Sequence, residues 1–91
     1  MTRPRMCRRV RFRPRANYYK PRGIPMSQLE EVLLSKEELE AVKLKDFDGL
    51  DQMAAAKKMK TSQSTFQRIL SSARNKIAQA IIRGNALRIE E

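Results

Sequence analysis

The chain has 91 residues, a formal net charge of +10 and a sequence pI near 10.5. A chain of this size forms one domain with a modest core. The core must be largely aliphatic, because Trp is absent and only 5% of the residues are aromatic. The charge favours a polyanionic partner, nucleic acid before an anionic membrane surface. No apolar run approaches the roughly 20 residues that span a bilayer. The N-terminus lacks the apolar middle of a signal peptide, so we expect a cytoplasmic protein without membrane contact.

The residue types argue against common catalytic and metal sites. The chain has no His, and Cys7 is its only cysteine. An intrachain disulfide is therefore impossible, and a zinc site would need carboxylate ligands. There is no Gly-rich phosphate loop and no acidic cluster with metal-ligand spacing. We expect no enzyme and no cofactor. Cys7 is expected to be a packed thiol, with a redox or intersubunit role as the alternative.

Residues 1–28 are predicted to form a basic, largely extended arm. They hold nine Arg and Lys residues, no acid and four prolines, which exclude a long helix. Within the arm, Arg8–Phe12 alternates basic and apolar residues, as a short strand does. Three roles stay open: a flexible arm in the minor groove, an ordered strand touching phosphates, or an RNA-binding or solubilising tail. We favour DNA contact for part of the arm, through Arg3, Arg5, Arg8 and Arg9.

Residues 29–91 are predicted to form the folded domain, with a first helix over about 36–46. The segment 29–34 before it is ambiguous between helix and extended chain. Ser35 and Glu38 match a capping box, in which each side chain bonds the other residue's backbone N–H. The expected inward stripe of this helix is Leu39, Val42 and Phe47. We expect Tyr18 and Tyr19 of the arm to pack beneath it rather than stack on bases.

A second helix over about 52–58 and a third that continues to about Ile82 follow, joined by a turn at Lys60-Thr61. Asp51 and Ser62 are their expected N-caps. The second helix offers for burial Met53, Ala55, Ala56 and Met59. The third has apolar residues at helical spacing, namely Phe66, Ile69, Leu70, Ala73, Ile77, Ala80 and Ile81. Gly84-Asn85 ends it, and Ala86–Ile89 is expected as a strand pairing with Arg8–Phe12 or with another subunit.

The second and third helices together have the pattern of a helix-turn-helix module. Ala55 and Ala56 allow the helices to cross closely, while Phe66 and Ile69 fill the angle between them. Polar and basic side chains then project from the third helix, where Gln suits adenine, Arg suits guanine, and Ser or Thr suit bases or phosphates. The predicted DNA-contacting residues of the module are Lys60, Gln63, Ser64, Thr65, Gln67, Arg68 and Ser71, with Arg74 and Lys76 on the DNA backbone. The alternative is that these polar residues form an ordinary solvent-exposed helix face without a binding role.

The stretch Leu34–Ala80 resembles region 4 of the bacterial sigma factors. Nearly the whole chain is similar to a family of uncharacterised prokaryotic proteins predicted to bind DNA. Four segments carry that similarity: RPR-C-RRV at Arg3–Val10, K-P-x-G-I-P at Lys20–Pro25, LEEV at Leu29–Val32 and G-x-A-L-R-I at Gly84–Ile89. The resemblance implies a sigma-region-4-like helix-turn-helix fold and DNA binding, without a known target.

The turn between the second and third helices departs from the pattern of that family. The family usually has Gly where this chain has Lys60, and an aliphatic residue where it has Thr61. If Lys60 adopts a positive φ, the strain costs on the order of 1 kcal/mol.

The expected fold class is mainly α: a three-helix helix-turn-helix domain with a basic N-terminal arm and short N- and C-terminal strands. The expected function is sequence-specific binding of double-stranded DNA by a transcription regulator. A homodimer is expected, because the third helix is roughly 30 Å long and exceeds what one groove needs. If the protein is not a dimer, we expect the distal residues of the third helix to pack against Leu39 and Val42 of the same chain. The alternatives are a module that docks on RNA polymerase or another transcription protein through the acidic 30–51 segment, and a basic RNA-binding protein.

Overall fold

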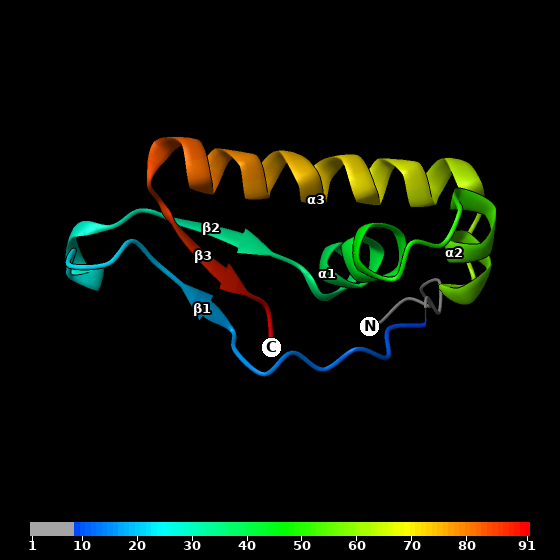
Figure 1. The fold of residues 1–91 in the computed structure, drawn as a ribbon, viewed down its shortest axis with the longest axis horizontal. Helices are drawn as coiled ribbons and strands as arrows, with labels where there is room; N and C mark the ends of the chain where they lie inside the picture. The colour runs from blue at the N-terminus through cyan, green and yellow to red at the C-terminus, as the bar shows by residue number, and fades with distance from the viewer. Residues whose placement is uncertain (1–8) are drawn as a thin grey trace, which may run out of the picture.

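The computed structural model describes residues 9–91, in which one long helix lies over a pair of short helices and a small sheet (Figure 1). The helices are α1 (Lys36–Val42), α2 (Gln52–Lys58) and α3 (Gln63–Arg83). A 3-10 turn, η1 (Met26–Gln28), precedes them, and a π-helical turn, η2 (Lys43–Phe47), continues α1. The strands are β1 (Tyr18–Tyr19), β2 (Glu31–Leu34) and β3 (Ala86–Ile89). The chain is mainly helical, as predicted.

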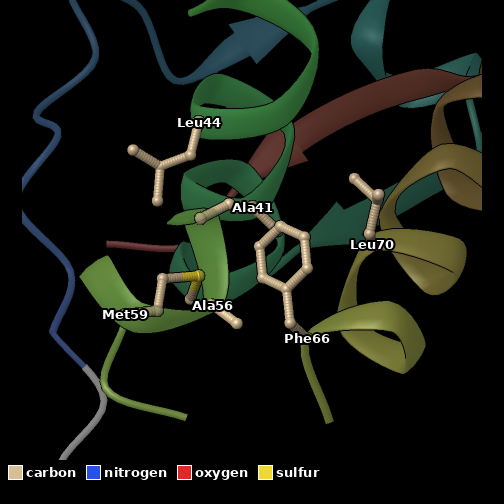
Figure 2. Close-up of a cluster of buried hydrophobic side chains, with 7 residues drawn as sticks. Ala41, Leu44, Ala56, Met59, Phe66 and Leu70 are labelled. Carbon is tan, nitrogen blue, oxygen red and sulfur yellow. The ribbon is translucent and has the colours of Figure 1, made fainter. Parts of the chain in front are cut away.

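The first half of α3 packs on α1 and α2. The core between these helices consists of Ala41, Leu44, Ala55, Ala56, Met59, Phe66 and Leu70, and Figure 2 shows the Phe66 ring reaching from α3 toward the other two helices. Ala55, Ala56 and Phe66 take the positions that the sequence predicts for a close helix crossing, and Ile69 packs against the same cluster. Small residues on α2 bring its backbone close enough for one aromatic ring to fill the remaining space.

The second half of α3 packs on the sheet. Leu34, Ala73 and Ile89 form the centre of this second core. Four partly buried residues pack against them: Leu39, Val42, Ile77 and Leu87. The distal part of α3 therefore packs within its own chain. Leu39 and Val42 take part in this packing, as expected for the alternative in which no second subunit covers α3.

The sheet has the order β1-β3-β2, so the strand that follows α3 lies in its centre. β3 is antiparallel to β1, with Tyr18 opposite Arg88, and parallel to β2, with Leu34 opposite Ile89. On the face away from α3, Arg88 donates two hydrogen bonds to Glu31, 2.8 and 2.9 Å long, and Tyr18 donates one of 2.8 Å. These hydrogen bonds lower the pKa of Glu31 to about 2 and connect all three strands.

The strand at Ala86–Ile89 is confirmed, but its predicted pairing with Arg8–Phe12 is wrong. Residues 9–12 form no strand, and residue 8 lies outside the described part of the chain. The backbone N–H groups of Arg11 and Phe12 donate to the Glu40 carboxylate instead of to a neighbouring strand. Tyr18 and Tyr19, which were expected to pack beneath the first helix, form β1 instead. The 29–34 segment, which was ambiguous between helix and extended chain, forms a strand from Glu31 onward.

Three apolar residues expected to be buried are exposed. The first helix ends at Val42 rather than near residue 46, and the π-helical turn leaves Phe47 82% exposed. The i→i+5 turn of η2 is wider than an α-helical turn, so it rotates the following side chains away from the positions that α-helical spacing predicts. Met53 is 64% exposed because the two-turn α2 buries only the face of Ala55 and Ala56. Ile81 is 73% exposed at the margin of the α3 stripe.

The helix ends agree with the predicted caps. Ser35 and Glu38 form the complete capping box, and the Asp51 and Ser62 side chains accept from the backbone N–H of the third residue after each. Gly84 ends α3 in the left-handed region, at φ 70°. The turn before α3 contains Lys60 at φ 56°, the only residue other than Gly with a positive φ in the described part of the chain.

We predict that Lys60→Gly raises the free energy of unfolding by about 0.5–1 kcal/mol, because Gly adopts a positive φ without the Cβ clash of Lys. Urea denaturation followed by circular dichroism measures this change. Lys57→Gly is the matched control, because it removes the same charge inside α2 and should destabilise by about 1 kcal/mol. Equal destabilisation by both substitutions would contradict the strain assigned to the turn.

Candidate nucleic-acid interface

One side of α3 carries an exposed row of polar and basic residues. Its members in the first turns are Gln63, Ser64, Gln67, Arg68 and Ser71. They lie opposite the buried stripe that starts at Phe66 and Leu70, since the periodicity of a helix separates the two faces. These five predicted site residues are therefore brought together on one accessible surface, here called the α3 row.

Local hydrogen bonds order the start of the α3 row. The Gln67 amide donates to the Ser71 hydroxyl over 3.1 Å, one helical turn further on. Thr65 is half-buried, and its hydroxyl accepts from the Ser62 cap over 3.0 Å. Thr65 thus belongs to the helix cap, while the Gln67–Ser71 pair presents its remaining donors and acceptors to the outside.

The segment that contains α2 and α3 is basic. The sequence holds no acidic residue between Asp51 and Glu90, a stretch that contains all of α2 and α3. Lys57 and Lys58 lie exposed in the last turn of α2, and Lys60 lies exposed in the following turn. A surface with this charge attracts polyanions and repels acidic partners.

Arg74 and Lys76 differ from the row, because both are held by acids of the same chain. Arg74 donates to both oxygens of Asp46 in η2, at 3.1 and 2.6 Å, and these hydrogen bonds lower the pKa of Asp46. Lys76 donates to Glu38 and to the backbone carbonyl of Leu33, both at 2.9 Å. These two predicted contacts are thus engaged in fixing α3 to η2, α1 and β2.

Glu38 is the polar centre of the contact between α1 and α3. It is buried, and it accepts from the Ser35 N–H, the Ser72 hydroxyl and the Lys76 ammonium group. Burial by itself raises the pKa of Glu38, but the three hydrogen bonds outweigh burial and leave the pKa below its ordinary value. Because Ser72 and Lys76 lie one turn apart on α3, their hydrogen bonds to one carboxylate fix the rotation of the helix.

The predicted arm contacts are only partly within the described chain. Arg9 is exposed, and its backbone N–H donates to the Met59 carbonyl over 3.0 Å, beside the turn before α3. Arg3, Arg5 and Arg8 lie outside the described residues. From Arg9 the chain passes on the side of α1 that faces away from α3 (Figure 1).

Sequence analysis did not single out Asn75, which also belongs to this surface. It is exposed and lies four residues after Ser71, so it extends the α3 row by one turn. The four-residue spacing from Ser71 is the sequence signal that places Asn75 on this side of the helix.

These features describe a small basic protein, mainly helical, with a three-stranded sheet and an exposed polar row on its longest helix. The chain belongs to the family described as "Protein of unknown function DUF134", which it matches over residues 1–91. Among its relatives, the UPF0251 proteins of Desulforudis audaxviator and Thermoanaerobacter pseudethanolicus are 54% and 52% identical to it. The UPF0251 protein of Dehalococcoides mccartyi is 57% identical.

Each of these relatives is longer than this chain. The alignments cover 99% of this chain but 59%, 76% and 77% of the three relatives in the order given. No solved structure gives a significant match. Within residues 9–91, no helix has both the length and the apolar character needed to cross a bilayer.

We predict that Glu38→Gln lowers the free energy of unfolding at pH 7 by about 1–3 kcal/mol, the usual effect of losing a charged partner in buried hydrogen bonds. Because the folded-state pKa of Glu38 is lowered, its contribution is present above the ordinary Glu pKa. It disappears as the pH falls through the lowered value. The difference between wild type and variant should therefore shrink toward pH 3.

Urea denaturation at pH 7 and pH 3 measures this difference, with the exposed Glu30→Gln as a control that removes the same charge. A loss of the same size at both pH values would show that the Glu38 side chain acts through packing rather than through its charge.

Proposed function

We propose that the protein binds double-stranded DNA in a sequence-specific manner and regulates transcription. In this proposal α2 and α3 form a helix-turn-helix related to sigma region 4, and α3 is the recognition helix. The observation that carries the proposal is the α3 row, an exposed set of Gln, Ser and Arg side chains on one helix that contains no acidic residue.

The dimensions of α3 support this proposal. An α-helix with its side chains is about 10–12 Å across and enters a major groove about 12 Å wide. Residues 63–71 extend over roughly 13 Å along the helix axis. The row therefore offers about two and a half turns for base contacts, while the rest of α3 packs on the sheet and holds the helix in place.

The residue types of the row support duplex DNA over single-stranded RNA. Gln67 and Arg68 are side chains that bond adenine and guanine edges in the major groove. Single-stranded RNA is more often recognised by exposed aromatic rings on which bases stack. The first turns of α3 contain one aromatic residue, Phe66, and it is fully buried.

Selection of bound duplexes from a random DNA pool at physiological salt tests the proposal. The expected result is a consensus sequence whose binding depends on Gln67 and Arg68. Recovery of no consensus, together with binding to single-stranded RNA only, would exclude the proposal and favour the basic RNA-binding alternative.

We extend the proposal to a homodimer, whose two α3 helices would read half-sites about one helical turn apart. The support is the exposure of Ile81 and Ile82 at the end of α3 that lies away from the α3 row. A palindromic consensus and a dimer mass in sedimentation are expected. A single half-site bound by a monomer would remove this extension and leave DNA binding intact.

Docking on RNA polymerase is the second candidate, favoured by the acidic 30–51 segment. Within it, however, Glu31, Glu38 and Asp46 already bond Arg88, Lys76 and Arg74. Capture of the polymerase that survives nuclease treatment, without DNA affinity of the protein itself, would favour this candidate.

We predict that Arg68→Ala weakens binding to the selected duplex by about 1–3 kcal/mol and relaxes preference at one base position. The reason is the loss of a guanidinium group that pairs with a base edge. Fluorescence anisotropy against the consensus and its single-base variants measures both effects. Arg83→Ala removes the same charge from the other end of α3 and should leave base preference unchanged. If both variants keep the parental preference, Arg68 does not read a base.

We predict a different effect for Lys60→Gln, which removes a charge beside the row without changing the strained φ. Affinity should fall by a similar factor for every duplex, and the slope of log K against log salt should become shallower by about 1. Anisotropy titrations at several salt concentrations measure the slope. An unchanged slope would place Lys60 away from the phosphates.

A further inference from the structure

The basic stretch near the N-terminus forms an alternating strap, residues 9–14, although it pairs with no strand. Arg9 and Arg11 line a hollow beside α1 and η2, whereas Val10 and Pro14 line a different hollow next to Leu39 and Ile89. Phe12 and Arg13 lie between the two hollows and line both. The alternation seen in the sequence therefore places Arg9 and Arg11 on the opposite side of the strap from Val10 and Pro14, as it would in a strand.

Backbone contacts hold the strap in this orientation. Glu40 is only 5% exposed, and its carboxylate accepts from the N–H groups of Arg11, at 3.2 Å, and Phe12, at 2.9 Å. The N–H of Arg9 donates to the Met59 carbonyl. One acid on α1 thus fixes the main chain, which leaves the arginine side chains available for other partners.

Cations predominate around the hollow on the arginine side, here called the strap hollow. Lys43 and Lys58 join the three arginines, whereas Glu40 and Asp48 are the only acids that line it. Asp48 is paired with Lys43 at 2.9 Å, and Glu40 is used by the backbone. Among residues 9–91, no acid pairs with the side chains of Arg11, Arg13 or Lys58, and the five cations that line the hollow outnumber its two acids.

We propose that the strap hollow binds the phosphate or pyrophosphate group of a small ligand. Its volume of about 410 Å³ lies in the range of small-molecule sites. The planar guanidinium groups of Arg11 and Arg13 suit paired phosphate oxygens, and Lys58 adds a point charge. The site goes beyond the proposed DNA contact, because the strap lies on the opposite side of α1 from α3 (Figure 1).

The strap hollow also has a direct connection to the turn before α3. The hydrogen bond from Arg9 joins the strap to Met59, which is followed by Lys60 and the Ser62 cap. A ligand in the strap hollow would therefore lie close to the turn that precedes α3.

The test is a titration of the isotope-labelled protein with inorganic pyrophosphate, followed by amide NMR shifts at constant ionic strength. We expect saturable shifts at the amides of Arg11, Phe12 and Lys43, and none of comparable size at Gln67. Arg11→Gln combined with Arg13→Gln should weaken binding at least about tenfold, because two charge-assisted contacts are lost. Arg22→Gln combined with Arg83→Gln gives the same net charge outside the hollow and should retain the affinity.

Two results would overturn the proposal. Equal weakening by both double variants would show that pyrophosphate responds only to net charge. Shifts at Arg11 and Phe12 with duplex DNA, but not with pyrophosphate, would show that the hollow contacts a nucleic-acid backbone instead of a small ligand. Failure of the proposed DNA binding is recognised separately, because it is read from Gln67 and Ser71 in a titration with the selected duplex.

Discussion

The whole structure depends on α3 burying one continuous apolar stripe against two different partners. Phe66 and Leu70 close the core with α1 and α2, and Ala73 and Ile77 close the core with the sheet. Because a single rigid helix crosses both cores, the short helices and the sheet are fixed relative to each other. The same rigidity requires the opposite side of α3 to form a straight, exposed row, and that row is the surface on which the proposed function rests.

Ion pairs between the secondary-structure elements add to this packing. Acids on α1, η2 and β2 are engaged within the chain, where Glu38, Asp46 and Glu31 bond Lys76, Arg74 and Arg88. Burial makes the Glu38 pair sensitive to substitution, whereas exposed pairs contribute little by themselves. Because the chain has 20 Lys and Arg residues and 10 acids, many basic residues stay without an acidic partner, and this excess attracts polyanions.

The starts of the three helices and the end of α3 were predictable from the sequence because local chemistry determines them. Ser35, Asp51 and Ser62 each accept a backbone N–H, and Gly84 adopts the left-handed conformation that ends α3. The π-helical turn was not predictable, since no side-chain signal marks an i→i+5 turn, and the expected burial of Phe47 failed with it. The sheet pairing was also out of reach, because β1, β2 and β3 lie far apart in the sequence.

In the candidate site too, features set by local sequence were predictable, whereas contacts between residues distant in the sequence were not. Exposure of Gln67, Arg68 and Ser71 follows from helical periodicity, so the sequence identified them. Arg74 and Lys76 were assigned to DNA because their acidic partners, 28 and 38 residues away in the sequence, are not visible in a local pattern. The alternating strap was visible in the sequence, but its attachment to Glu40 depends on a contact 28 residues distant.

The central position of β3 has a consequence for how the protein is made on the ribosome. β1 and β2 emerge early, yet neither can pair with the other because β3 must lie between them. The sheet therefore cannot assemble until residue 89 has left the exit tunnel, well after α1 and α2 are available to fold. During that interval Leu34 has no strand to cover it, so the nascent chain exposes an aliphatic side chain that the finished fold buries.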